Sequence, residues 1–108
     1  MTGARASLPP RVTFGQRQLQ AKFKHAADFG ISGPFSPVNM AVYRAALEAH
    51  LSSPTTQVIQ GTYRGQPVSH FFDPATSLNV IVDPRGTFVS GWRLNPAHAV
   101  NLQTRGSL

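Results

Sequence analysis

The sequence predicts an α+β fold in which N-terminal helices pack on a small antiparallel β-sheet. Apolar residues recur at helical spacing in the first half of the chain, up to about residue 51. After Pro54 the chain turns to short runs rich in Val, Ile, Phe and Tyr, separated by turns that contain Pro, Gly and Asp. A chain of 108 residues with this order of elements fits one domain.

The first thirteen residues show no such periodicity. They combine Pro9 and Pro10 with small residues and two arginines, a composition typical of linkers. We therefore expect a flexible lead or linker over residues 1–13 and the folded domain over residues 14–108. No apolar run approaches the roughly 18 residues of a membrane span, and residues 1–11 lack the hydrophobic segment of a signal peptide. The sequence thus predicts no membrane segment.

A first helix of two to three turns is expected from about residue 15. Leu19, Phe23 and Ala26 would form its apolar stripe, because they are spaced four and three residues apart. Lys22 and His25 would then share one face of this helix as i, i+3 neighbours.

A second helix is expected after a loop over residues 28–35. Ser36 and Pro37 predict its start, with Ser as the N-cap and Pro at the first helical position. We expect it to reach about Leu51, where Ser52-Ser53-Pro54 ends it. Its apolar residues fall on two opposite sides, which predicts that both sides are packed.

Four strands are expected in the second half, joined by short turns that predict antiparallel pairing. They cover residues 57–63, 68–72, 78–82 and 87–94. In the last strand, alternation would place Phe88, Ser90, Trp92 and Leu94 on one face and Val89, Gly91 and Arg93 on the other. The residues from 95 onward are polar and contain Pro96, so we expect an irregular tail.

The chain is strongly basic. Ten Lys and Arg residues outnumber four Asp and Glu residues, which gives a formal net charge of +6 and a pI near 11.3. Such a surface attracts polyanions, and nucleic acid is the leading class of partner. A membrane surface or an inert basic surface are alternatives, but the basic residues are scattered singly rather than gathered in one run. The absence of cysteine excludes disulfides, thiolate metal sites and a cysteine nucleophile.

The stretch best suited to chemistry is Lys22-Phe23-Lys24-His25-Ala26-Ala27-Asp28-Phe29-Gly30-Ile31. A histidine, with a pKa of about 6.5, exchanges protons near neutral pH. Two lysines beside it would hold a phosphodiester against it. Metal-free RNA cleavage requires this combination. In the alternative interpretation, His25 balances a helix dipole and Lys22 and Lys24 are ordinary solvated cations.

Ser90 and Trp92 form a second candidate pair, separated by a glycine that would let a ligand approach closely. Trp92 could stack a base and Ser90 could donate to a phosphate oxygen. Equally, Trp92 could be a core residue and Ser90 a filler. A Ser–His–Asp triad of Ser90, His25 and Asp28 is formally available, but no nucleophile-elbow pattern surrounds the serine.

Arg64, Arg93 and His70 are further candidates for substrate binding, although His70 beside two phenylalanines also fits a packed strand position. Four histidines invite a metal site. No two of them lie at i, i+4 on a helix, however, and four carboxylates are few ligands. We therefore expect no metal and no cofactor.

The pattern Lys-x-Lys-His-Ala-x-Asp-Phe-Gly-Ile resembles the opening of the C-terminal nuclease domain of the colicin D family, bacterial toxins that cut transfer RNA. Two further blocks follow in the same order and together extend the resemblance over about residues 18–96. They are Tyr43-Arg44 through Glu48-Ala49-His50-Leu51 to Gly61-Thr62-Tyr63-Arg64, and Ser90-Gly91-Trp92 with Asn95-Pro96. The chain departs from the family at Gly65-Gln66-Pro67, where the hairpin looks short, and in the tail.

The resemblance implies a metal-independent ribonuclease fold of the barnase–colicin–RelE type. It also implies that His25 is the central catalytic group, that Lys22 and Lys24 bind the phosphates, and that Ser90 and Trp92 line the same site. In the implied reaction, a ribose 2′-hydroxyl attacks its own phosphodiester in the anticodon loop of a transfer RNA. The products are a 2′,3′-cyclic phosphate and a 5′-hydroxyl.

The resemblance further implies a larger parent toxin, made and exported by a bacterium and acting in the cytoplasm of a target cell. A dedicated immunity protein would block the site, and we expect that protein to be acidic because the domain is basic. Two alternatives stay open: a non-catalytic RNA- or DNA-binding module on the same basic face, and an acyl hydrolase built on Ser90.

Overall fold

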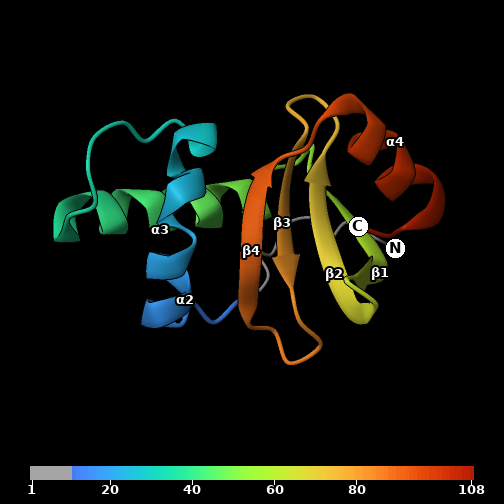
Figure 1. Ribbon diagram of the computed structural model, residues 1–108, viewed down its shortest axis with the longest axis horizontal. Coiled ribbons are helices and arrows are strands. Elements are labelled where there is room, and N and C mark those ends of the chain that lie inside the picture. Colours follow the sequence, from blue (N-terminus) through green and yellow to red (C-terminus); the bar gives the residue numbers. More distant parts are fainter. Residues whose placement is uncertain (1–10) are drawn as a thin grey trace.

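The computed structural model describes residues 11–108, which form three layers (Figure 1). A four-stranded antiparallel sheet stands in the middle, with α2, η1 and α3 on one face and α4 on the other. The elements are α2 (Gln16–Ala21), the 3₁₀ helix η1 (Phe23–Phe29), α3 (Pro37–Ser52), β1 (Gln57–Tyr63), β2 (Gln66–Asp73), β3 (Leu78–Val82), β4 (Phe88–Arg93) and α4 (Pro96–Arg105). The predicted α+β class is confirmed.

The single first helix that we expected is instead two helices that meet at Lys22. Residue 22 leaves helical geometry at φ −99° and ψ 3°, and the chain continues as the 3₁₀ helix η1. Gly30 ends η1 in the left-handed conformation at φ 86°, which glycine adopts without steric cost. The expected loop therefore begins after Phe29 rather than at residue 28. Apolar spacing alone does not distinguish a 3₁₀ helix from the last turn of an α-helix.

The start and the bounds of the second helix, α3, are confirmed, but the prediction that both of its apolar sides are packed is wrong, because Val38 and Val42 are 72% and 50% exposed. The Ser36 hydroxyl accepts the Asn39 backbone N–H at 3.0 Å, and Pro37 occupies the first turn. Tyr43 and Leu47 are fully buried, and they anchor α3 in the cluster between the helices and the sheet. This cluster has as its buried members Phe14, Leu19, Ala26, Ile31, Tyr43, Leu47, Leu51, Phe71, Val80, Val82 and Phe88.

The strands follow the order β1-β2-β3-β4, and each pairs with its neighbours in sequence. The first hairpin turns through only Arg64 and Gly65, since Tyr63 already pairs with Gln66. Both turn residues have positive φ, 53° and 80°, which is the geometry of a tight two-residue hairpin. The turn is therefore two residues shorter than the segment 64–67 that we expected.

A bulge in β4 corrects the predicted faces of that strand. Val82 pairs with Phe88 and Ile81 pairs with Ser90, so Val89 has no partner across β3. The extra residue reverses the alternation. Phe88 therefore faces the helices, whereas Trp92 belongs to the cluster on the opposite face. We had placed these two residues on one face.

The tail is also corrected, because Pro96–Arg105 form the helix α4. The Asn95 side chain accepts the His98 backbone N–H at 2.8 Å, Pro96 occupies the first turn and Gly106 ends the helix. Ala99 and Leu102 pack with Phe72 and Leu94 on the second face of the sheet. Beyond α4, residues 106–108 run beside the end of β1 through hydrogen bonds such as Arg64 N to Leu108 O at 2.9 Å.

Most of the expected lead, residues 1–10, lies outside the described residues. Its last part belongs to the fold. The Thr13 backbone donates to Gly86 O at 2.8 Å and accepts from Phe88 N at 2.9 Å, and Val12 packs against the helix-side cluster. Among residues 11–108, none of the helices has the length and apolar character needed to cross a bilayer.

Candidate active site

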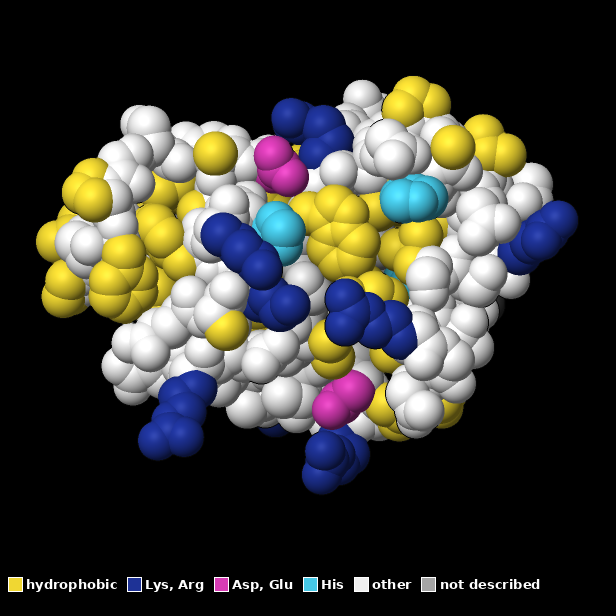
Figure 2. Space-filling model, in the orientation of Figure 1, with side chains coloured by type: hydrophobic (Ala, Val, Ile, Leu, Met, Phe, Trp, Pro, Cys, Tyr) yellow, Lys and Arg dark blue, Asp and Glu magenta, His cyan; other side chains and the backbone are white. Residues whose placement is uncertain are grey.

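Four side chains form a row across one surface of the domain. The ring centroids of His25 and Trp92 lie 5.8 Å apart, and those of Trp92 and Tyr63 also lie 5.8 Å apart. The Arg64 guanidinium lies 5.2 Å from the Tyr63 ring centroid. The row thus joins η1, β4 and the end of β1. Figure 2 shows Lys, Arg and His side chains around an apolar centre on this face of the molecule.

The 3₁₀ geometry of η1 aligns three polar side chains at the candidate site. Residues three apart eclipse one another in a 3₁₀ helix, so Lys22, His25 and Asp28 follow one edge of η1. We expected Lys22 and His25 to share a helix face, and the 3₁₀ helix brings them closer to alignment than an α-helix would. Lys24 is exposed on the same short helix.

Tyr43 fixes the junction between α2 and η1 at Lys22, where this edge of η1 begins. Its hydroxyl donates to the Lys22 backbone carbonyl at 2.9 Å. That carbonyl also accepts the His25 backbone N–H at 2.9 Å. Burial raises the pKa of Tyr43 well above its ordinary value, so the phenol stays a donor. The buried side of α3 therefore fixes the start of η1.

Asp28 and Arg93 tie the other end of η1 to β4. The Asp28 carboxylate accepts the Arg93 backbone N–H at 3.0 Å. The Arg93 guanidinium donates to the carbonyls of Asp28 and Thr76, both at 3.3 Å. Arg93, which we expected to bind substrate, therefore uses two of its five guanidinium N–H donors to hold η1 against the strand that carries Trp92.

The cations at the site have no carboxylate partners. Among the described residues, the ion pairs are Arg44 with Glu48 at 3.6 Å and Arg85 with Asp83 at 3.8 Å. Partial burial, together with the nearby charges of Lys24 and Arg64, lowers the pKa of Lys22 from its ordinary value. The unpaired positive charge of Lys22, Lys24 and Arg64 makes this surface suited to an anion.

His25 is biased towards its neutral form. Desolvation by partial burial lowers its pKa, and the charges of Lys24 and Lys22 lower it further, while Asp28 opposes them. A histidine with a lowered pKa carries a free lone pair at neutral pH. Such a ring can accept a proton from a bound hydroxyl.

Two predicted site residues do not reach the surface. His70 and Ser90 are each 0% exposed, so neither contacts a surface-bound substrate in this conformation. His70 is instead hydrogen-bonded to Thr62 O and to Asn79. The Ser90 hydroxyl has no hydrogen-bond partner, and the described residues thus contain no Ser90–His25–Asp28 relay.

Tyr63 belongs to this row, although our sequence analysis did not name it as a candidate site residue. It is half-buried between Trp92 and Arg64. Its position next to a basic turn residue was the available signal. The sequence did not reveal that the sheet curls enough to bring the end of β1 to Trp92 on β4.

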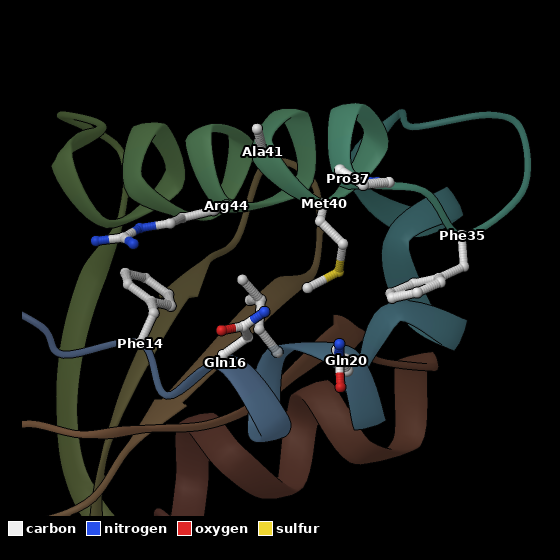
Figure 3. A pocket seen from close by; sticks show the side chains of 9 residues that line it. Phe14, Gln16, Gln20, Phe35, Pro37, Met40, Ala41 and Arg44 are labelled. Carbon is white, nitrogen blue, oxygen red and sulfur yellow. The ribbon is translucent and has the colours of Figure 1, made fainter.

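A groove of about 470 Å³ lies elsewhere, between α2 and α3 (Figure 3). Its lining is largely apolar, with Phe14, Phe35 and Met40 beside the single cation Arg44. It contains none of the candidate site residues, so we place the site on the surface row instead. Within residues 11–108, three or more His, Asp or Glu side chains nowhere gather closely enough to hold a metal.

Comparisons with known proteins identify the family of the chain. The family model described as Colicin D matches residues 18–102 of the chain. The chain belongs to the colicin D family. The match covers every residue of the row and its lysines, as well as Asp28 and Arg93.

Two relatives in this family stand out. The curated colicin D of Escherichia coli is 44% identical over 84 residues, which are 77% of this chain and 12% of that protein. The chain therefore spans about an eighth of its curated relative. A solved structure described as a ribonuclease from Escherichia coli complexed with its inhibitor protein matches with a TM-score of 0.76 and 38% identity. That match covers 84% of this chain and all of the solved one. The predicted family is confirmed.

Proposed function

We propose that this domain is a toxin ribonuclease that cleaves transfer RNA in the anticodon loop. The observation that carries the proposal is the row His25–Trp92–Tyr63–Arg64 with the unpaired Lys22 and Lys24 beside it. A proton acceptor, an aromatic platform and phosphate-binding cations meet at one place. The similarity to a ribonuclease solved with its inhibitor supports the same activity.

The row supports single-stranded RNA as the substrate. Bases stack on exposed aromatic side chains only when they are not stacked in a duplex, as in loops. Trp92 and Tyr63 provide such a platform beside His25. An anticodon loop supplies unstacked bases on a polyanionic backbone, and the resemblance to colicin D directs the proposal to transfer RNA.

His25 would act as the general base. Its neutral imidazole accepts the proton of a ribose 2′-hydroxyl, whose oxygen attacks the adjacent phosphorus. The bond from phosphorus to the 5′ oxygen breaks, and that oxygen takes a proton from water. A 2′,3′-cyclic phosphate and a 5′-hydroxyl result.

Lys22, Lys24 and Arg64 would stabilise the negative charge that grows on the phosphoryl oxygens, which is often the largest catalytic contribution. The chain thus supplies the base and the cations that stabilise charge, and water supplies the proton for the leaving oxygen. Ser90 would support the site from below the surface, on the strand and the sheet face that carry Trp92, without contacting the bound RNA.

We further propose that the domain is the C-terminal module of a larger toxin, as its match to a small part of a colicin suggests. A bacterium would export the toxin, which would act in the target-cell cytoplasm. An acidic immunity protein would cover Lys22, Lys24 and His25, since carboxylates can occupy the positions of phosphates.

The test is incubation of the purified domain with total transfer RNA, with and without a chelator, followed by analysis of the new ends. The proposal predicts 2′,3′-cyclic phosphate and 5′-hydroxyl ends at the same rate in both samples. Binding without cleavage would instead identify a non-catalytic RNA-binding module. Cleavage that stops with chelator would contradict the metal-independent mechanism.

A further inference from the structure

The buried histidine of β2, His70, links the two strands that carry the proposed site: β1, which ends at Tyr63, and β4, which contains Trp92. His70 Nε2 lies 2.9 Å from the carbonyl oxygen of Thr62, the residue before Tyr63 and Arg64. His70 Nδ1 lies 3.1 Å from Nδ2 of Asn79. Asn79 is the direct cross-strand partner of Trp92. One imidazole beneath the surface therefore links the backbone next to Tyr63 to the cross-strand partner of Trp92.

The partners determine the protonation state of this ring. A carbonyl oxygen only accepts, so Nε2 carries the hydrogen and donates to Thr62. Nδ1 is then free to accept from the Asn79 amide. A second proton on the ring would place two donors against each other at Nδ1. Burial lowers the pKa of His70 and favours the same neutral form.

The buried polar residues His70, Asn79 and Ser90 lower the stability of the fold relative to apolar residues, so packing alone does not explain their presence. His70, Asn79 and Ser90 are each 0% exposed on the same face of the sheet. Within residues 11–108, Asn79 Oδ1 and Ser90 Oγ have no hydrogen-bond partner. Buried polar groups without partners are destabilising, and apolar residues would fill the space more favourably.

We propose that His70 and Asn79 are positioning residues that hold the Tyr63–Arg64 turn and Trp92 at the separation the site requires. The catalytic part of this inference rests on the proposed ribonuclease function. The structural part does not, because Trp92 is the single tryptophan of the chain. The fluorescence of the protein therefore reports the surroundings of the Trp92 ring without any substrate.

The test compares four proteins: the native domain, His70→Phe with Asn79→Leu, His70→Gln, and Val82→Ala. Replacing both partners together by apolar residues avoids an orphaned amide and preserves the fold. Glutamine keeps a donor for Thr62 O. Val82 is buried in the helix-side cluster, on the other face of the same sheet, and its truncation controls for general destabilisation.

The double variant is expected to melt cooperatively and to show a shifted Trp92 emission maximum. Its kcat/KM on RNA should fall by about tenfold or more, because Trp92 and the Tyr63–Arg64 turn would be displaced from each other. His70→Gln should recover part of both signals, whereas Val82→Ala should keep the native emission. Native emission and kcat/KM in the double variant would overturn the proposal. Equal changes in Val82→Ala would overturn it too. If the native domain does not cleave RNA, the proposed function fails while the emission still decides the positioning role.

Discussion

The rings of His25 and Trp92 lie with their centroids 5.8 Å apart and their planes tilted by 34°. His25 comes from the 3₁₀ helix η1 and Trp92 from the last strand, and the Asp28–Arg93 hydrogen bonds hold these elements together. A base that stacks on Trp92 would therefore lie beside the imidazole.

Trp92→Ala should weaken RNA binding more than it weakens the fold. The loss of a stacking partner costs about 1–3 kcal/mol of affinity, and Trp92 is only partly buried. The measurements are the affinity for an RNA with a 2′-deoxy cleavage site and a thermal melt. Trp92→Phe is the control and should retain most of the affinity. A loss of stability of about 3–5 kcal/mol would show instead that Trp92 is mainly a core residue.

Lys22→Ala and Lys24→Ala should each flatten the salt dependence of RNA binding. Each phosphate contact that is lost removes about one released counterion from the slope. Arg85→Ala is the matched control, because Arg85 lies in the turn at the other end of β4 and is 88% exposed. Binding titrations at several salt concentrations provide the slopes. Equal slopes for the native domain and the lysine variants would identify these lysines as ordinary surface charge.

Charge reversal at Lys22 and Lys24 should damage immunity binding and RNA binding together. Both partners would place negative groups against the same cations. Titration of the double variant Lys22→Glu, Lys24→Glu with each partner measures this coupling. A variant that loses RNA but keeps the inhibitor at full affinity would place the inhibitor elsewhere.

Folding stability should fall as the pH drops below about 6.5. Burial lowers the pKa of His50 and of His70 in the folded chain. In this pH range the unfolded chain therefore binds more protons than the folded one, and stability rises with pH. The contribution is complete above the unfolded pKa and is lost as the pH falls towards the folded values. Urea denaturation at pH 5 and pH 7 should show a smaller difference for His50→Gln than for the native domain. An unchanged difference would show that His50 does not contribute to the pH dependence of folding stability.

Much of the fold could be predicted because its signals are local. The Ser36 cap with Pro37 defines the start of α3, and strand alternation with turn residues defines the sheet. The bulge at Val89 could not be predicted, because nothing in its neighbours requires an extra residue there. The helix α4 could have been, since Asn95-Pro96 carries the same type of start signal as Ser36-Pro37.

The candidate site could be predicted where its residues are neighbours in the sequence. It could not be predicted where the fold of the sheet brings distant residues together. Lys22, Lys24 and His25 are neighbours in the sequence, and the Ser90-Gly91-Trp92 pattern, which the resemblance to colicin D also covers, pointed to Trp92. Tyr63 joins them only through the curl of the sheet. His70 and Ser90 are buried on the face that α4 packs against, and we had expected no helix there.

The measurement that tests the account most directly is RNA cleavage by His25→Ala. The variant should keep the melting temperature of the native domain to within a few degrees, because His25 is partly exposed. It should cleave transfer RNA about 100-fold more slowly or worse, since a positioned base contributes about 100- to 10,000-fold, while still binding RNA through Lys22 and Lys24. Cleavage at the native rate by a folded His25→Ala domain would contradict the proposed mechanism.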